Sequence, residues 1–204
     1  MLLLVPTELE AELLRKAGLS PQVIGMGPVE AALGACSIFQ QGVSEPVVLA
    51  GIGGAYPESG LQIGDLALAT VEYFGDLGIC HYLIQGDFAE TLPALKECSL
   101  RHPLLEKAAL FLEEKFKIEC GPFVTVCCAT RDPKRGEILA FRHRGALIEN
   151  MEGFSVALAA RKCQITLLEL RAVSNLIAEP DAPWQIEKAL EILGEALKWL
   201  EKRL

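Results

Sequence analysis

Short apolar runs alternate with longer amphipathic segments along the whole chain. The apolar runs are about four to eight residues long and several are rich in β-branched residues, which is typical of buried strands. We expect strands at Leu2–Val5, Val23–Met26, Val47–Ile52, Leu66–Tyr73, Phe123–Cys128, Ala146–Glu149 and Thr166–Val173. We expect helices that begin at about Thr7, Gly27, Leu104, Glu152 and Pro183.

The boundaries of two helices are marked by the sequence itself. Thr7 with Glu10 three residues later is the pattern of a capping box. The segment Pro183–Lys202 carries an apolar stripe at helical spacing, in which we include Trp184. Strands that alternate with helices predict an α/β fold with three layers, in which helices flank both faces of a central mixed, largely parallel sheet. No repeat or linker divides the chain, so we expect a single domain over residues 1–204.

Composition and charge narrow the possible functions. The chain has 204 residues, is 51% hydrophobic and has a formal net charge of -8, which is unsuited to binding nucleic acid or an anionic membrane surface. No apolar stretch reaches the roughly 20 residues of a membrane-spanning helix, and no basic residues precede the apolar start. Seven scattered cysteines show no zinc-binding spacing. We therefore expect a cytoplasmic protein with no metal and no cofactor.

Polar residues follow four of the predicted strands. The segments are Thr7–Glu10, Gly51–Ala55, Asn150–Gly153 and Arg171–Asn175. Ligands of open α/β sheets bind beyond the carboxyl ends of the strands. The four segments therefore predict one binding site, provided that the order of the strands brings them together.

Each of these acidic and amide residues has a structural reading and a functional one. Glu8, Glu10 and Glu152 suit the first turn of a helix, where a carboxylate complements the helix dipole. In a site, a carboxylate can deprotonate a water, or accept both hydroxyls of a vicinal diol. Asn175 is a common turn residue, but in a pocket its amide offers a donor and an acceptor side by side.

The remaining candidates are weaker. Gly51 and Gly53 either form a tight turn or expose backbone amides to a ligand, whereas the nucleotide-binding Gly-Lys-Ser/Thr ending is missing. Cys127–Cys128 is interpreted as a pair of small buried strand residues, and Arg131–Arg135 as a solvated helix start or a site for a ligand carboxylate. Surface or helix roles are expected for the three histidines, His81, His102 and His143.

In chain order these segments resemble the nucleoside phosphorylase and nucleosidase superfamily. The resemblance is closest to the branch of methylthioadenosine/S-adenosylhomocysteine nucleosidases and futalosine hydrolases, and it covers nearly the whole chain. The motifs that carry it are Gly27 leading into Ala31–Ala32, Gly51–Ala55, Ile63–Ala69, Asn150–Gly153 and Arg171–Asn175. It implies a small-molecule nucleoside as substrate and a homodimer or higher homo-oligomer as the assembly.

The resemblance also assigns catalytic roles. It implies that Glu10 handles the attacking water, with Glu8 as the second choice. Glu152 is implied to bind the ribose 2′- and 3′-hydroxyls, with Met151 packed under the sugar, and Asn175 to face N7 of the purine.

Further substrate contacts are implied at the glycine loop and around the base. Gly51, Gly53 and Ser174 are expected to bind substrate. Ala129 and Thr130 fall where nucleosidases place an aromatic and an aliphatic residue against the base, and here the aromatic residue is missing.

Two departures from the family pattern predict the reaction. Adenine-specific nucleosidases carry Asp where this chain has Asn175, and a neutral amide suits a 6-oxopurine better than adenine. Phosphorylases hold phosphate with arginines near the glycine loop, but Arg15 is the only arginine before Leu100. We therefore expect hydrolysis of futalosine to hypoxanthine. The alternatives are a methylthioadenosine-type nucleosidase, an inosine/guanosine phosphorylase and a non-catalytic nucleoside-binding module.

Overall fold

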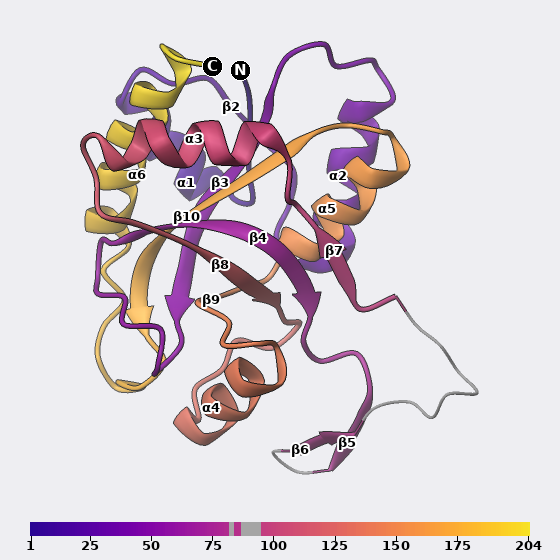
Figure 1. Cartoon of the computed structure of the whole chain (residues 1–204), viewed down its shortest axis with the longest axis vertical. Coiled ribbons are helices and arrows are strands. Elements are labelled where there is room, and N and C mark those ends of the chain that lie inside the picture. The colour runs from indigo at the N-terminus through magenta and orange to yellow at the C-terminus, as the bar shows by residue number, and fades with distance from the viewer. Residues whose placement is uncertain (82–83, 87–94) are drawn as a thin grey trace.

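The computed structural model describes residues 1–81, 84–86 and 95–204, and it has an α/β fold built on a mixed sheet (Figure 1). Strand β3 (Val47–Ala55) runs parallel to β1 (Leu2–Val5) and to β10 (Leu167–Leu176), and β2 (Pro21–Val23) extends the sheet beyond β1. On the other side, β10 pairs antiparallel with β4 (Leu66–Phe74).

The other strands close this sheet into a ring. β4 pairs parallel with β8 (Ile118–Thr125), β8 pairs parallel with β9 (Ile148–Asn150), and β9 returns antiparallel to β3. Because β3 also pairs with β10, the strands β10, β4, β8, β9 and β3 form a closed circuit of hydrogen bonds. Besides β1 and β2, three short strands lie outside this circuit in the described part of the chain, namely β7 (Glu97–Ser99) on β4 and the hairpin β5 (Ile79–His81) with β6 (Ile84–Gly86).

Helices cover both faces of the sheet (Figure 1). On one face, α2 (Gly27–Phe39) packs against α5 (Gly153–Lys162), and both helices join a core with the inward residues of β1 and β3. On the other face, α1 (Glu8–Lys16), α3 (Pro103–Glu113) and α6 (Ile186–Glu201) bury leucine and alanine side chains. A third, smaller cluster lies under α4 (Pro133–Arg142). The predicted three-layer fold class is confirmed.

Local sequence signals explain several helix boundaries. Thr7 Oγ1 accepts from Glu10 N, and the Glu10 carboxylate accepts from Thr7 N, so the predicted capping box is present. Asp132 caps α4 by accepting from Lys134 N. Among the described residues, no helix is both long enough and apolar enough to cross a membrane.

Three predictions about secondary structure are wrong. The second strand ends at Val23, because Gly25 and Gly27 adopt positive φ angles of 98° and 80° and turn the chain into α2. Cys127 and Cys128 are exposed beyond the end of β8, where Asp76 accepts from both backbone amides. Trp184 lies before α6 and is 52% exposed, so it does not belong to the buried stripe of that helix.

Candidate active site

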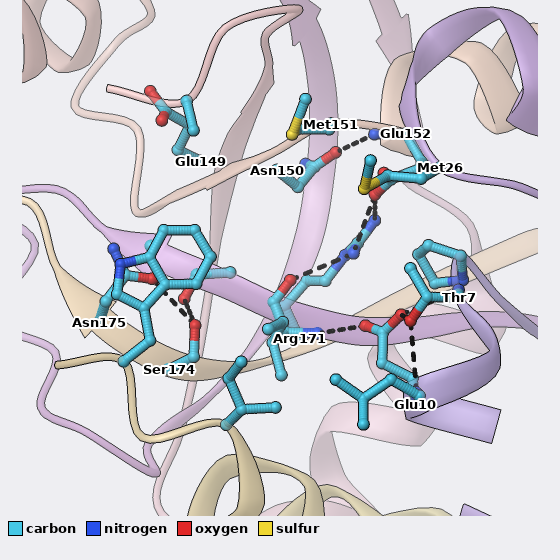
Figure 2. Close-up of a pocket in the computed structure, with 18 of the residues that line it drawn as sticks. Thr7, Glu10, Met26, Glu149, Asn150, Met151, Glu152, Arg171, Ser174 and Asn175 are labelled. Atoms are coloured by element: carbon cyan, nitrogen blue, oxygen red, sulfur yellow. Dashed lines mark hydrogen bonds and ion pairs between the residues drawn. The ribbon is translucent and has the colours of Figure 1, made fainter. Parts of the chain in front are cut away.

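A pocket of about 180 Å³ opens where β1, β3, β9 and β10 end (Figure 2). Its lining brings together all four polar segments that the sequence singles out. Of the predicted site residues it includes Glu10, Gly53, Ala129, Thr130, Met151, Glu152, Ser174 and Asn175. Figure 2 shows Glu10, Arg171 and Glu152 on one side of this pocket and Ser174 with Asn175 on the other.

Glu10 is held at the end of β1 by its own helix cap. Its Oε2 accepts from Thr7 N at 3.0 Å and from Thr7 Oγ1 at 2.6 Å, and its Oε1 accepts from Ile52 N at 3.1 Å. Burial raises the pKa of Glu10, while the Thr7 hydroxyl and the Arg171 charge oppose that rise. The capping role and the pocket position therefore belong to the same side chain.

Glu8 does not share this position. Its side chain is exposed and forms an ion pair with Arg15 on the outer face of α1. Glu8 is absent from the pocket lining, so of the two glutamates considered for the water the structure places Glu10 at the pocket.

Glu152 lies at the N-cap of α5 and its side chain points into the pocket. Its Oε1 accepts from Gly27 N at 3.0 Å, and its Oε2 lies 3.4 Å from both Nη1 and Nη2 of Arg171. Glu152 is the residue before the first turn of α5, and its side chain makes no cap hydrogen bond. The turn is stabilised by Asn150, whose Oδ1 accepts from Glu152 N and Gly153 N.

Arg171 is a buried cation that lies beside the glycine loop. The sequence did not indicate this position for its charge. Arg171 is 1% exposed, its Nε donates to Glu169 Oε1 at 2.9 Å, and its Nη1 donates to Ile52 O at 3.2 Å. The expectation that no cation lies near this loop is therefore wrong. The carboxylates Glu169, Glu152 and Glu10 surround the guanidinium, and they raise its pKa above its ordinary value.

Gly51 lies behind the pocket and does not line it. A Cβ atom at this position would lie 2.7 Å from both Arg171 Nη1 and Glu10 Oε1. The glycine is therefore needed to let the cation and the carboxylate approach the strand. Gly53 lines the pocket, as expected.

Ser174 and Asn175 form the opposite side of the pocket, at the end of β10. Ser174 Oγ lies 2.9 Å from Asn175 Oδ1 and 3.3 Å from Gly53 O, so the shorter hydrogen bond goes to the amide oxygen. Asn175 Nδ2 has no protein acceptor among the described residues. The amide therefore presents a donor to a ligand.

Ala129 and Thr130 line the same pocket, but neither supplies a flat apolar surface. Thr130 donates to the buried Glu149 carboxylate through its N at 2.7 Å and its Oγ1 at 2.6 Å. Tyr56 Oη donates to the same carboxylate at 3.1 Å. Neither Ala129 nor Thr130 therefore brings an aromatic ring to the pocket.

An aromatic side chain reaches the pocket from a different element. Trp184 lines it, and Gln185 N donates to Ser174 O at 2.7 Å, which fixes this segment beside the end of β10. Met26, just before α2, is another lining residue that the sequence analysis missed. The sequence gives no sign that Trp184 lies at the pocket. Its 52% exposure, which separates it from the buried stripe of α6, is visible only in the structure.

The weaker candidates lie outside the pocket. His102 caps α3 by accepting from Leu104 N, and the His143 ring packs 4.9 Å from that of Tyr73, so both histidines have the helix or surface roles expected of them. His81 lies in β5. Cys127 is exposed overall, but partial desolvation and the neighbouring Asp76 carboxylate raise its pKa, which argues against a thiolate nucleophile there. Arg135 donates to Cys128 O at 2.8 Å, at the start of α4.

Comparison with known proteins defines the class first. A model of the phosphorylase superfamily matches residues 18–202. The chain therefore belongs to the phosphorylase superfamily. Two solved structures from Helicobacter pylori share the fold across 99% of this chain and 97% of theirs. The 5′-methylthioadenosine/S-adenosylhomocysteine nucleosidase with butyl-thio-DADMe-Immucillin-A has a TM-score of 0.83 at 20% identity, and native futalosine hydrolase has 0.82 at 19% identity.

Curated relatives then narrow the class to the nucleosidases. Futalosine hydrolase of Thermus thermophilus is 30% identical over 213 residues, which cover 98% of this chain and 94% of the relative. Futalosine hydrolase of Streptomyces coelicolor is 38% identical over 163 residues, which cover 74% of this chain but 63% of the relative's length. Within the superfamily the chain thus belongs with the N-glycosyl hydrolases.

Proposed function

We propose that the protein hydrolyses the N-glycosidic bond of futalosine, releasing hypoxanthine and the dehypoxanthine sugar product. The observation that carries this proposal is the orientation of Asn175. Its amide oxygen accepts from Ser174 Oγ at 2.9 Å, and its amide nitrogen, which has no protein acceptor among the described residues, is left to donate to the base. Named relatives that are futalosine hydrolases support the same substrate.

The edge of the base explains why this amide favours hypoxanthine. A 6-oxopurine presents two acceptors side by side, N7 and O6, whereas adenine presents an acceptor at N7 and a donor at N6. The two hydrogens of Asn175 Nδ2 match two acceptors. With adenine, the N6 amino group would face Asn175 Nδ2, so two donors would oppose each other. Unpaired polar groups in a buried site are costly, and we therefore expect adenine to be strongly disfavoured relative to a 6-oxopurine.

Glu10 and Glu152 take the other two roles. In the proposed reaction, Glu10 accepts a proton from water, the water oxygen bonds to C1′ and the C1′–N9 bond breaks, with the electron pair leaving on the base. Glu152 accepts the ribose 2′- and 3′-hydroxyls and favours the positive charge that develops on the sugar. General-base assistance of this kind contributes on the order of 100- to 10,000-fold.

The charges around Arg171 favour water over phosphate as the nucleophile. Its guanidinium contacts Glu169 at 2.9 Å and Glu152 at 3.4 Å, and the charge of Glu10 acts on it as well. One cation among three carboxylates does not create a positive site, so a phosphate dianion would be repelled.

One assay separates this proposal from its alternatives. The protein is incubated with futalosine, inosine and methylthioadenosine, each with and without inorganic phosphate, and the released bases are separated by chromatography. We expect hypoxanthine from futalosine at the same rate in both conditions. Release of adenine from methylthioadenosine alone, or a strict need for phosphate, would contradict the proposal.

The non-catalytic alternative is also tested by the site. It predicts that Glu10 or Glu152 points away from a shared cleft, whereas both line the same pocket. The arrangement of Glu10 and Glu152 therefore supports an enzyme over a module that only binds nucleosides. The remaining alternative, a methylthioadenosine-type nucleosidase, would need an acid in place of the Asn175 amide to protonate N7.

The cellular setting is part of the same proposal. We propose that residues 1–204 act as one nucleoside phosphorylase-like domain in the cytoplasm, as a homodimer or higher homo-oligomer. Futalosine as the substrate would place the reaction in menaquinone biosynthesis. The chemistry proposed here uses side chains and water, with Gly53, Ala129, Thr130 and Met151 as further substrate contacts that line the pocket.

A further inference from the structure

Two glutamates lie directly behind the pocket and take no part in the proposed reaction. Glu72 on β4 and Glu169 on β10 are both 0% exposed, and neither lines the pocket. A Cβ atom at Gly153 would overlap Glu72 Oε1 and would lie 2.5 and 2.6 Å from the two oxygens of Glu169. The two carboxyl groups therefore face each other beneath the first residue of α5.

The hydrogen bonds around this pair lack one donor. Glu169 Oε1 accepts from Arg171 Nε at 2.9 Å, but Glu169 Oε2 is buried without a hydrogen-bond partner among the described residues. Glu72 accepts from Asn150 Nδ2 at 2.5 Å and from Thr125 Oγ1 at 2.7 Å. A buried carboxylate oxygen without a donor is strongly unfavourable, and an O–H on the facing carboxyl group would supply that donor.

The charges in this region also require a proton. Four carboxyl groups, those of Glu10, Glu72, Glu152 and Glu169, lie around the guanidinium of Arg171. Burial raises the pKa of Glu72, and the facing charge of Glu169 raises it further. Burial raises the pKa of Glu169 too, against the opposing effect of Arg171.

Other titratable groups near the pair do not supply positive charge. The Cys98 thiol on β7 and the Tyr56 hydroxyl after β3 both interact electrostatically with Glu72, and burial raises the pKa of each of them. Both groups are therefore neutral at neutral pH. Arg171 is the cation that acts on both carboxyl groups of the pair, while Arg161 acts on Cys98 and Arg135 acts on Tyr56.

We propose that Glu72 and Glu169 hold a single proton between them and act as a positioning pair for Arg171. The proton lies between Glu72 and the unpaired Glu169 Oε2, so the pair carries one negative charge instead of two. That charge anchors Arg171 through Nε on Glu169. Nη1 and Nη2 are then left at a loose 3.4 Å from Glu152, whose carboxylate stays free to accept the ribose hydroxyls.

The proton is tested by the pH dependence of unfolding. The variants Glu72→Gln and Glu169→Gln each leave one carboxylate and one N–H donor in the pair, with no proton to gain on folding. An unfolded glutamate ionises near pH 4.3, so above about pH 5.5 the folded wild type holds one proton more than its unfolded chain. Its stability is therefore lost as the pH rises towards the raised folded pKa values.

Urea unfolding of the full chain between pH 5.5 and 8 measures this difference. The unfolding constant of the wild type should rise with pH relative to either variant, by up to about tenfold per pH unit, because one proton is released on unfolding. Any hydrogen bond lost in a variant adds a constant offset and leaves this slope intact. The exposed control Glu58→Gln should show no change of slope. Equal slopes for the wild type and both pair variants would overturn the proposal.

The positioning role has a separate readout that depends on the proposed function. Glu72→Gln keeps the negative charge on Glu169 beside Arg171 Nε, whereas Glu169→Gln moves it to Glu72. In Glu169→Gln, Arg171 loses its partner at Nε and pairs more tightly with Glu152, which is then less free to accept the ribose hydroxyls. KM for futalosine in Glu169→Gln should therefore exceed that in Glu72→Gln by about tenfold, with a smaller change in kcat. Equal KM values would overturn the positioning role. If futalosine is not cleaved at all, the proposed function fails, and the unfolding slopes still decide whether the proton is shared.

Discussion

Ser174 and Asn175 show how a single hydrogen bond sets the direction of an amide. The serine hydroxyl lies 2.9 Å from Asn175 Oδ1, and Gly54 leaves room for the amide, because a Cβ atom there would come within 3.1 Å of Asn175 Nδ2. The donor side of Asn175 therefore faces the ligand. At this scale the proposed preference for a 6-oxopurine depends on one nitrogen atom.

The substitution Asn175→Asp tests that dependence. An aspartate offers only acceptors when ionised and can donate to N7 when protonated, so it suits adenine and opposes O6. We expect kcat/KM for hypoxanthine nucleosides to fall and the ratio of adenine to hypoxanthine nucleosides to rise by about 10- to 100-fold, which is the effect of about 1.4 to 2.8 kcal/mol. Competition between futalosine and methylthioadenosine measures the ratio.

The matched control is Asn175→Ala, which removes the hydrogen bonds to both bases. It should lower the activity towards both nucleosides without reversing their order. If Asn175→Asp leaves the selectivity unchanged, this amide does not face the leaving base.

The ends of the strands, more than any single helix, hold the site together. β3 runs between β1 and β10 and brings Ile52 within hydrogen-bond reach of Glu10 and of Arg171. Close approach of these side chains to β3 is possible because Gly51 has no side chain. The glycine run is therefore a packing requirement of the site as well as a turn.

Gly51→Ala tests this requirement against a second buried glycine. A Cβ atom at Gly51 would lie 2.7 Å from Glu10 Oε1 and Arg171 Nη1, and such overpacking costs about 1 to 3 kcal/mol. In Gly194→Ala on α6, the Cβ atom would lie 3.4 Å from Ala17 and 3.5 Å from Leu14, which is ordinary contact.

Urea denaturation and nucleosidase assays should separate the two variants. We expect Gly51→Ala to lose stability and most of its activity. Gly194→Ala should keep its activity and gain up to about 1 kcal/mol from the helix propensity of alanine. Full activity in Gly51→Ala would show that Glu10 and Arg171 do not need their present positions.

The fold and the polar residues at the strand ends could be predicted from local patterns. Buried strands and a capping box are short-range signals, and polar residues after strands mark the edge where ligands bind, so Glu10, Glu152 and Asn175 were found. Arg171 was missed as a cation near the glycine loop because 119 residues separate it from Ile52. Trp184 was missed because its apolar character fits a helix stripe, and only the bond from Gln185 N to Ser174 O shows where it lies.

The molecule as a whole has an apolar stripe on its surface next to the mouth of the pocket. Met26, Val29 and Leu33 are 59%, 71% and 69% exposed, and their spacing puts them along one side of α2. The opposite side of α2 buries Ala31, Ala35 and Phe39. Met26 and the exposed Leu9 also line the pocket, so the stripe continues into the site. We expect the partner of the proposed homodimer to cover this surface.

Leu33→Asp tests the interface, because an aspartate in the centre of a buried apolar contact carries a large desolvation penalty. Light scattering should show a dimer for the wild type and a monomer for this variant. KM for futalosine should rise several-fold, because the pocket mouth at Leu9 and Met26 loses its cover, and the Tm should fall and no longer depend on protein concentration. The control is Phe141→Asp on α4, which replaces a side chain that is 86% exposed on a different element. A wild-type monomer, or dissociation caused equally by Phe141→Asp, would contradict an interface at α2.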